Sequence, residues 1–132
     1  MSQENVEIVL RIYEEVSTNG RPPSEVFDPD YAVDLTHAAP DLGVIHGVEA
    51  SEAALAEYRE TFDGFRIEVT EVIHADEDHV VTDVRDGGRL KGSDAEVWNR
   101  FFHVWTFRDG RVIGRSSHGE RNRALDAAGL SE

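Results

Sequence analysis

Residues 96–120 read EVWNRFFHVWTFRDGRVIGRSSHGE. Two runs rich in aromatic and β-branched residues flank Asp109-Gly110, a dipeptide typical of the two-residue type I′ turn. We therefore predict a long β-hairpin in which Arg108 faces Arg111. Counting outward from this turn, the other predicted pairs are Phe107 with Val112, Trp105 with Gly114, His103 with Ser116, Phe101 with His118 and Asn99 with Glu120.

The predicted register gives the hairpin two different faces. One face is apolar near the turn and polar at its far end, where Asn99, His103, His118 and Glu120 gather. Because both faces hold aromatic residues, we expect both to be covered, one by helices and the other by another subunit. The residues of the second face are Trp98, Phe102, Val104, Thr106, Ile113 and Arg115.

The composition limits the class of protein. At 132 residues the chain has the size of one domain. Its formal net charge of −14 disfavours nucleic acids and anionic membranes as partners, because both are negatively charged. It has no cysteine, which excludes disulfides and thiolate chemistry. No apolar run approaches about 18 residues and no basic-then-apolar leader is present, so we expect a cytoplasmic domain without a membrane span or signal peptide.

The remaining elements are predicted from periodicity and from turn residues. We expect a first helix that stops before Pro22-Pro23, a strand over 31–37, a second helix over 48–62 and a short helix over 122–128 ended by Gly129. This order predicts an α+β domain with helices on one side of a curved antiparallel sheet. The apolar stripe of the first helix is Val6, Val9, Ile12, Tyr13 and Val16.

A second hairpin is expected around a turn at 76–78, and its register stays open. A three-residue turn places Val81 and Asp83 on the face of Ile73, whereas a two-residue turn places Val80 and Thr82 there. One residue of slip exchanges the two sets, so any role for Asp83 depends on this turn. The glycines at 87–88 are expected in the loop that leads to the long hairpin.

The element order, the run HVWTFRDGRVI over 103–113 and the tail ALDAAGL over 124–130 resemble the nuclear transport factor 2-like superfamily, and within it SnoaL-like and ketosteroid isomerase-like proteins. The resemblance covers nearly the whole chain and implies a single SnoaL-like domain over residues 1–132. It implies a cone-shaped antiparallel sheet wrapped around N-terminal helices, with a hydrophobic cavity open at one end. It also implies a homodimer through the outer sheet face, which here carries Trp98, Phe102, Val104 and Ile113.

The same resemblance implies roles for single residues. Ketosteroid isomerases use a first-helix tyrosine seven residues before a glycine as an oxyanion donor, and Tyr13 before Gly20 matches this spacing. His103, four residues before Phe107, stands where those enzymes place a protonated aspartate. Leu35 stands in place of their aspartate base, so the isomerase base is absent. An acid or base from elsewhere would be His118, Glu120 or Asp83.

Three functions remain open. The first is cofactor-free acid–base chemistry of isomerase, cyclase or hydrolase type on a small apolar molecule, with His103 moving the proton and Tyr13 stabilising an oxyanion. The second is binding of such a molecule without turnover, and the third is a dimeric interaction module. We expect no cofactor and no metal, because no HxH or HxxxH pair occurs. The candidate catalytic residues are His103, Tyr13, His118 and Asp83, and the candidate substrate-binding residues are Trp105, Phe101, Phe107, Asn99, Tyr58 and Glu120.

Overall fold

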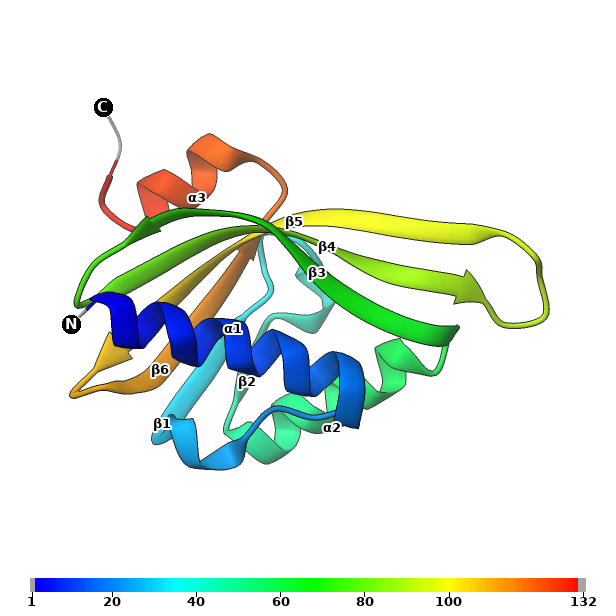
Figure 1. Cartoon of the computed structure of the whole chain (residues 1–132), viewed down its shortest axis with the longest axis horizontal. Coiled ribbons are helices and arrows are strands. Elements are labelled where there is room, and N and C mark those ends of the chain that lie inside the picture. Colours follow the sequence, from blue (N-terminus) through cyan, green and yellow to red (C-terminus); the bar gives the residue numbers. More distant parts are fainter. Residues whose placement is uncertain (1, 131–132) are drawn as a thin grey trace.

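The computed structural model describes residues 2–130, which form three α-helices, two short 3₁₀ helices and one six-stranded sheet (Figure 1). This confirms the predicted α+β class. In chain order the elements are α1 (Ser2–Asn19), η1 (Ser24–Val26), β1 (Phe27–Asp34), η2 (Pro40–Leu42), β2 (Val44–His46), α2 (Val48–Arg59), β3 (Phe62–Ala75), β4 (His79–Leu90), β5 (Glu96–Arg108), β6 (Arg111–His118) and α3 (Arg121–Ala127).

The strands are ordered β2-β1-β6-β5-β4-β3 in one sheet. Four neighbouring pairs are antiparallel, and the three among β3, β4, β5 and β6 were predicted. β1 runs parallel to β6, so the sheet is mixed. More than half of the chain, residues 35–110, separates β1 from β6, and no tight turn therefore dictates their relative direction. The short strand β2 lies in a stretch that was expected to be loop, and it is the edge strand next to β1.

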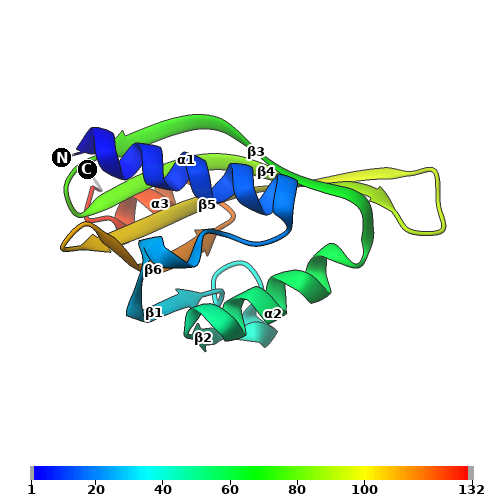
Figure 2. The same cartoon turned by 60° about the horizontal axis from the view of Figure 1, so that its bottom comes forward.

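The helices divide between the two faces of the sheet. Figure 1 shows α1 and α2 on one side of the curved strands and α3 on the other, and Figure 2 shows α1 lying along the sheet above α2. The predicted stripe of α1 is buried at Val9, Ile12, Tyr13 and Val16. The second helix ends at Arg59 rather than in the region of residue 62, because the chain there already enters β3.

The long hairpin has the predicted turn but a different register. Arg108 pairs with Arg111, and both turn residues adopt positive φ (Asp109 53°, Gly110 79°), as a type I′ turn requires. Beyond Phe107 and Val112 the pairing shifts by one residue, because Ile113 forms a β-bulge. The observed pairs are Thr106 with Gly114, Trp105 with Arg115, Val104 with Ser116, His103 with Ser117 and Phe102 with His118.

This bulge corrects the predicted faces of β6. A shift of one residue turns every later side chain to the opposite side of the sheet. Arg115 and Ser117 therefore share the inner face with His103, whereas His118 pairs with Phe102 on the outer face. The prediction that His103 and His118 share one face of the sheet is wrong.

The register of the β3–β4 hairpin, which the sequence left open, is also decided by an irregularity in the strand pairing. The closing bond runs from Asp76 N–H to the His79 carbonyl (2.8 Å), which leaves a two-residue turn. A further irregularity near Ile73 then places Ile73 with Val81 on the outer face. Asp83 also lies on that face, where it is buried against β5 and paired with a guanidinium.

The outer face is covered in part by α3 of the same chain. Ala124 and Ala128 pack on Phe102 and Val104, which are 5% and 2% exposed. Gly129 (φ 77°) ends this helix as predicted, and the amide of residue 130 donates to the carbonyl of residue 125 in a Schellman-type cap (2.8 Å).

This cover corrects the predicted dimer surface. Phe102 and Val104 are already buried within one chain, and the guanidinium of Arg85 lies 4.3 Å from the Trp98 ring centroid. A homodimer through the outer sheet face therefore stays a prediction, without these two buried residues as contacts. Among residues 2–130, no helix is both long and apolar enough to cross a membrane.

The glycines expected in a loop lie inside β4 instead. Gly87 has φ +149°, and a Cβ there would lie 1.9 Å from the Val97 carbonyl oxygen on β5. The two strands approach so closely at this point that only glycine fits.

We predict that Gly87→Ala lowers the free energy of unfolding by at least about 2 kcal/mol, because the added methyl group displaces a neighbouring backbone. Urea denaturation measures the change. Gly119→Ala is the matched control: nothing lies within 4 Å of the added atom, and the change should stay within about 0.5 kcal/mol. Equal stability of the two variants would contradict the observed packing of β4 on β5.

Candidate functional site

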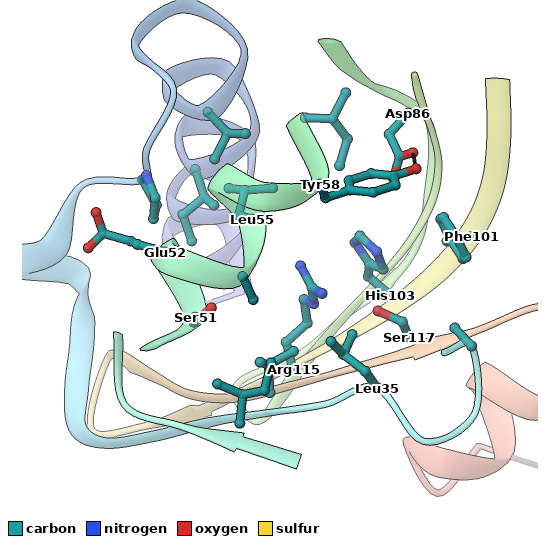
Figure 3. Close-up of a pocket in the computed structure, with 18 of the residues that line it drawn as sticks. Leu35, Ser51, Glu52, Leu55, Tyr58, Asp86, Phe101, His103, Arg115 and Ser117 are labelled. Carbon is teal, nitrogen blue, oxygen red and sulfur yellow. Dashed lines mark hydrogen bonds between the residues drawn. The ribbon is translucent and has the colours of Figure 1, made fainter. Parts of the chain in front are cut away.

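A pocket of about 200 Å³ lies between α1, α2 and the inner face of the sheet (Figure 3). Most of its wall is apolar, and a few polar side chains project into it from α1, α2, β4, β5 and β6. This combination is typical of small-molecule sites. Among the apolar lining residues are Ile12, Val16, Leu35, Leu55, Ile67 and Phe101.

The hydroxyl of Tyr13 is the centre of a buried polar cluster. Trp105 Nε1–H donates to Tyr13 Oη (2.7 Å), which also shares hydrogen bonds with Thr82 Oγ1 (2.7 Å) and His103 Nδ1 (2.8 Å). Helical spacing places Tyr13 on the buried stripe of α1, and strand alternation places the three partners on one face of β4 and β5. Burial raises the pKa of Tyr13, so the phenol keeps its proton.

These contacts use the whole hydrogen-bonding capacity of the phenol, which has one proton and two lone pairs. If Tyr13 donates to His103, the other imidazole nitrogen carries the proton. If Tyr13 donates to Thr82, then His103 donates to Tyr13 and its Nε2 is an acceptor. Tyr13 therefore controls the tautomer of His103 and has no free proton for a ligand.

His103 is a neutral imidazole at the pocket wall. Its pKa lies well below the usual 6.5, first because the ring is buried and then because Arg115 and His118 add positive charge nearby. Its Nδ1 contacts Tyr13, which leaves Nε2 for the pocket. The ring stacks on Phe101 with 6.3 Å between centroids, which fixes its orientation.

A second polar group of the pocket, the carboxyl of Asp86, lies on β4. Tyr58 Oη donates to Asp86 Oδ1 (2.6 Å) and accepts from Asn99 Nδ2 (2.9 Å). Burial raises the pKa of Asp86, against the hydrogen bond from Tyr58 and the charge of Arg115. Asp86 lies four residues beyond Thr82, so their Cα atoms are about 13 Å apart at the usual strand rise.

Arg115 and Ser117 are two further polar side chains on the sheet side of the pocket. Both lie on β6 opposite Trp105 and His103, and both line the pocket. The Arg115 guanidinium lies 5.6 Å from the Trp105 ring centroid. Arg115 Nε and Ser117 Oγ are buried without a hydrogen-bond partner in the structure.

The pocket brings together half of the residues predicted from the sequence. Five of these residues line it: His103, Tyr13, Trp105, Phe101 and Tyr58. The other five do not: His118, Asp83, Phe107, Asn99 and Glu120.

Each residue outside the pocket has another environment. Phe107 is buried in the core, and Asn99 donates to the hydroxyl of Tyr58 without lining the pocket itself. Glu120 is exposed ahead of α3, 3.6 Å from a guanidinium of that helix. Asp83 accepts from Arg100 Nε at 3.0 Å.

His118 belongs to a separate pair at the end of β6. Its ring stacks on His37, from the loop after β1, with 5.0 Å between centroids, and its Nε2 contacts Ser116 Oγ at 2.8 Å. Burial, followed by the nearby His37, lowers the pKa of His118. No group of three acidic or histidine side chains suited to a metal ion occurs in the described part of the chain.

The polar lining residues that were missed in the sequence include Ser51 and Glu52 on α2, and Asp86, Arg115 and Ser117 on the sheet. The last two were assigned to the wrong face or left out because the bulge was not foreseen. Asp86 could have been found, since it continues the row Val80, Thr82 and Val84 at a spacing of two.

Comparison with known proteins agrees with this architecture. The sequence model of the SnoaL-like domain matches residues 9–114. The chain belongs to the SnoaL-like family. No match was found among curated proteins.

Solved structures with the same fold include other SnoaL-like proteins. Bal32a, from a soil-derived mobile gene cassette, is 23% identical, with 96% of each chain covered and a TM-score of 0.76. A putative SnoaL-like polyketide cyclase from Jannaschia sp. CCS1 is 23% identical, with 98% of this chain and 92% of that chain covered and a TM-score of 0.73. A hypothetical protein with a ketosteroid isomerase-like fold from Catenulispora acidiphila, in complex with trimethylamine, is 18% identical, with 94% and 93% covered and a TM-score of 0.70.

We predict that the His103 ring stays neutral at pH 6.5, where an ordinary histidine is half protonated. Ring ¹⁵N shifts recorded from about pH 8 to pH 5.5 measure this directly. The unfolded chain takes up a proton below about pH 6.5 and the folded ring does not. The contribution of His103 to stability is therefore present above that pH and is lost as the pH falls towards the folded pKa.

His103→Gln should accordingly reduce the loss of unfolding free energy between about pH 7 and pH 5. A His103 titration midpoint near the ordinary value would contradict the burial of this ring.

Proposed function

We propose that the pocket binds a small, largely apolar, carbonyl-bearing molecule and that His103 moves a proton to or from it without a cofactor. The observation that carries this proposal is the contact of His103 Nδ1 with Tyr13 in a mostly apolar wall (2.8 Å). A neutral imidazole with one nitrogen held and the other facing a pocket is suited to general acid–base catalysis.

The chemistry at His103 follows from its tautomer. With Nδ1–H donated to Tyr13, the Nε2 lone pair is a base that can remove a proton next to a carbonyl group. With the proton on Nε2, the same ring donates to a carbonyl oxygen or returns the proton to carbon. The Tyr13 hydroxyl can satisfy both states by rotating between Thr82 and His103.

Tyr13 is therefore a positioning residue in this proposal. The sequence prediction gave it the role of oxyanion donor, but its single proton is already used within the protein. It fixes the imidazole much as the orienting member of a catalytic triad fixes its histidine.

The substrate class is supported by the wall and by the family. Aromatic and aliphatic side chains suit a ring-bearing molecule with few polar groups. The similar Jannaschia structure is described as a putative SnoaL-like polyketide cyclase. At 23% identity this likeness supports the fold, and the chemistry proposed here depends on the residues of the pocket.

A second candidate is binding without turnover. It is favoured by the surroundings of His103, which hydrogen-bonds to Tyr13 and, within residues 2–130, to no carboxylate. It is also favoured by Leu35 at the pocket wall, where the family's isomerases place their base. The two candidates differ only in whether a bound ketone exchanges its protons.

We predict that the protein accelerates deuterium exchange at the α-carbon of cyclic ketones in D₂O, followed by ¹H NMR. His103→Gln should reduce this acceleration by at least about a hundredfold, because general acid–base catalysis contributes that much. The control is His46→Gln, which changes an exposed histidine of β2 and should leave the rate unchanged.

Two results would decide against catalysis. Ketones that perturb the His103 signals without exchanging would support the binding candidate. Exchange that persists at full rate in His103→Gln would remove His103 from the chemistry.

A further inference from the structure

We propose that Arg115, together with Ser117, anchors a carboxylate group of the pocket's ligand beside His103. This inference rests on the proposed function for the location of the ligand and adds the chemical class: a small aromatic or alicyclic acid. It assigns a specificity-determining role to two residues of β6 that face the pocket only because of the bulge at Ile113.

Arg115 brings a positive charge into a mostly apolar wall, where it counteracts the rise that burial causes in the pKa of Asp86 but forms no ion pair with that residue. Its Nε is buried and has no hydrogen-bond partner, and no salt bridge joins it to an acidic residue within residues 2–130. Its guanidinium packs on the face of Trp105, which holds it in place but leaves its donors unused. Burying an N–H donor without a partner is costly, and a ligand oxygen that accepts from it would remove that cost.

The two acidic residues that line the pocket, Glu52 and Asp86, do not fill this role. The carboxylate of Asp86 accepts from Tyr58, and no ion pair joins either residue to Arg115. Figure 3 shows the nitrogen atoms of Arg115 pointing towards the middle of the pocket, with His103 and Ser117 beside them.

Ser117 supplies a second unused donor at the same place. Its side chain is 3% exposed, its Oγ has no partner in the structure, and it lines the pocket opposite His103. Arg115 and Ser117 are two residues apart on one strand face, so their Cα atoms are about 7 Å apart. A planar arginine fork next to a hydroxyl matches a carboxylate, which can accept from both groups.

The charge of the whole chain makes this local arrangement more specific. A chain of net charge −14 repels anions in general. An acid would therefore gain affinity only where a positive group is held in place and partly removed from water, as the half-buried Arg115 is in this pocket. Placed there, the carboxylate would hold the neighbouring carbon atoms of the ligand next to His103 Nε2.

The test compares matched pairs of acids and amides, namely phenylacetate with phenylacetamide and 2-naphthoate with 2-naphthamide, at about pH 8. Dissociation constants come from calorimetry and from NMR titration, which also locates the ligand through the His103 signals. We expect each acid to bind the unmodified protein at least about tenfold more tightly than its amide, as one charged hydrogen-bonded pair would provide.

Three variants assign this difference to its residues. Arg115→Gln should abolish the preference for the acid, and Ser117→Ala should reduce it. Arg111→Gln removes the same charge from an exposed site on the same strand and should leave the preference intact. Should Arg115→Gln fail to fold, the acid–amide comparison in the unmodified protein and the Ser117→Ala variant still decide the question.

The outcomes separate this inference from the proposed function. Equal binding of acids and amides, or an acid preference that persists in Arg115→Gln, overturns the carboxylate anchor even when the His103 signals respond. Absence of any response at His103 to either member of a pair overturns both the anchor and the proposed ligand site.

Discussion

One additional residue in β6 determines which side chains face the pocket. Ile113 has no partner on β5. Every later residue of β6 therefore faces the side of the sheet opposite to the one predicted by counting residues from the turn. Arg115 and Ser117 thereby join the pocket, and His118 moves to the outer face to stack on His37. Because of the bulge, the pocket contains one neutral histidine next to a guanidinium instead of the predicted pair of histidines.

The Tyr13 hydroxyl then connects the helix to the sheet. It contacts Thr82 on β4 and both His103 and Trp105 on β5, so one buried phenol fixes α1, two strands and the imidazole tautomer together. Such a cluster is stable only when every donor and acceptor is used, as they are at Tyr13. The unused donors of the inner face lie instead at Arg115 and Ser117, where a ligand can reach them.

Several predictions that depended on local signals were confirmed, whereas those that depended on the exact pairing of distant strands were not. The turn at Asp109-Gly110, the buried stripe of α1 and the cap at Gly129 each follow from a few neighbouring residues. The parallel pairing of β1 with β6 and the bulge at Ile113 depend on how distant strands twist and pack, which no dipeptide signals. Tyr13 and His103 were therefore found from the sequence, whereas Arg115 was assigned to the wrong face.

The most direct test of this account is the pairing of β5 with β6, measured by interstrand nuclear Overhauser effects between backbone protons in solution. The account predicts contacts of Trp105 with Arg115 and of Phe102 with His118. Contacts of Trp105 with Gly114 and of Phe101 with His118 would show a regular hairpin without the bulge. Arg115 would then face away from the pocket, and the arrangement of His103, Arg115 and Ser117 described above would not exist.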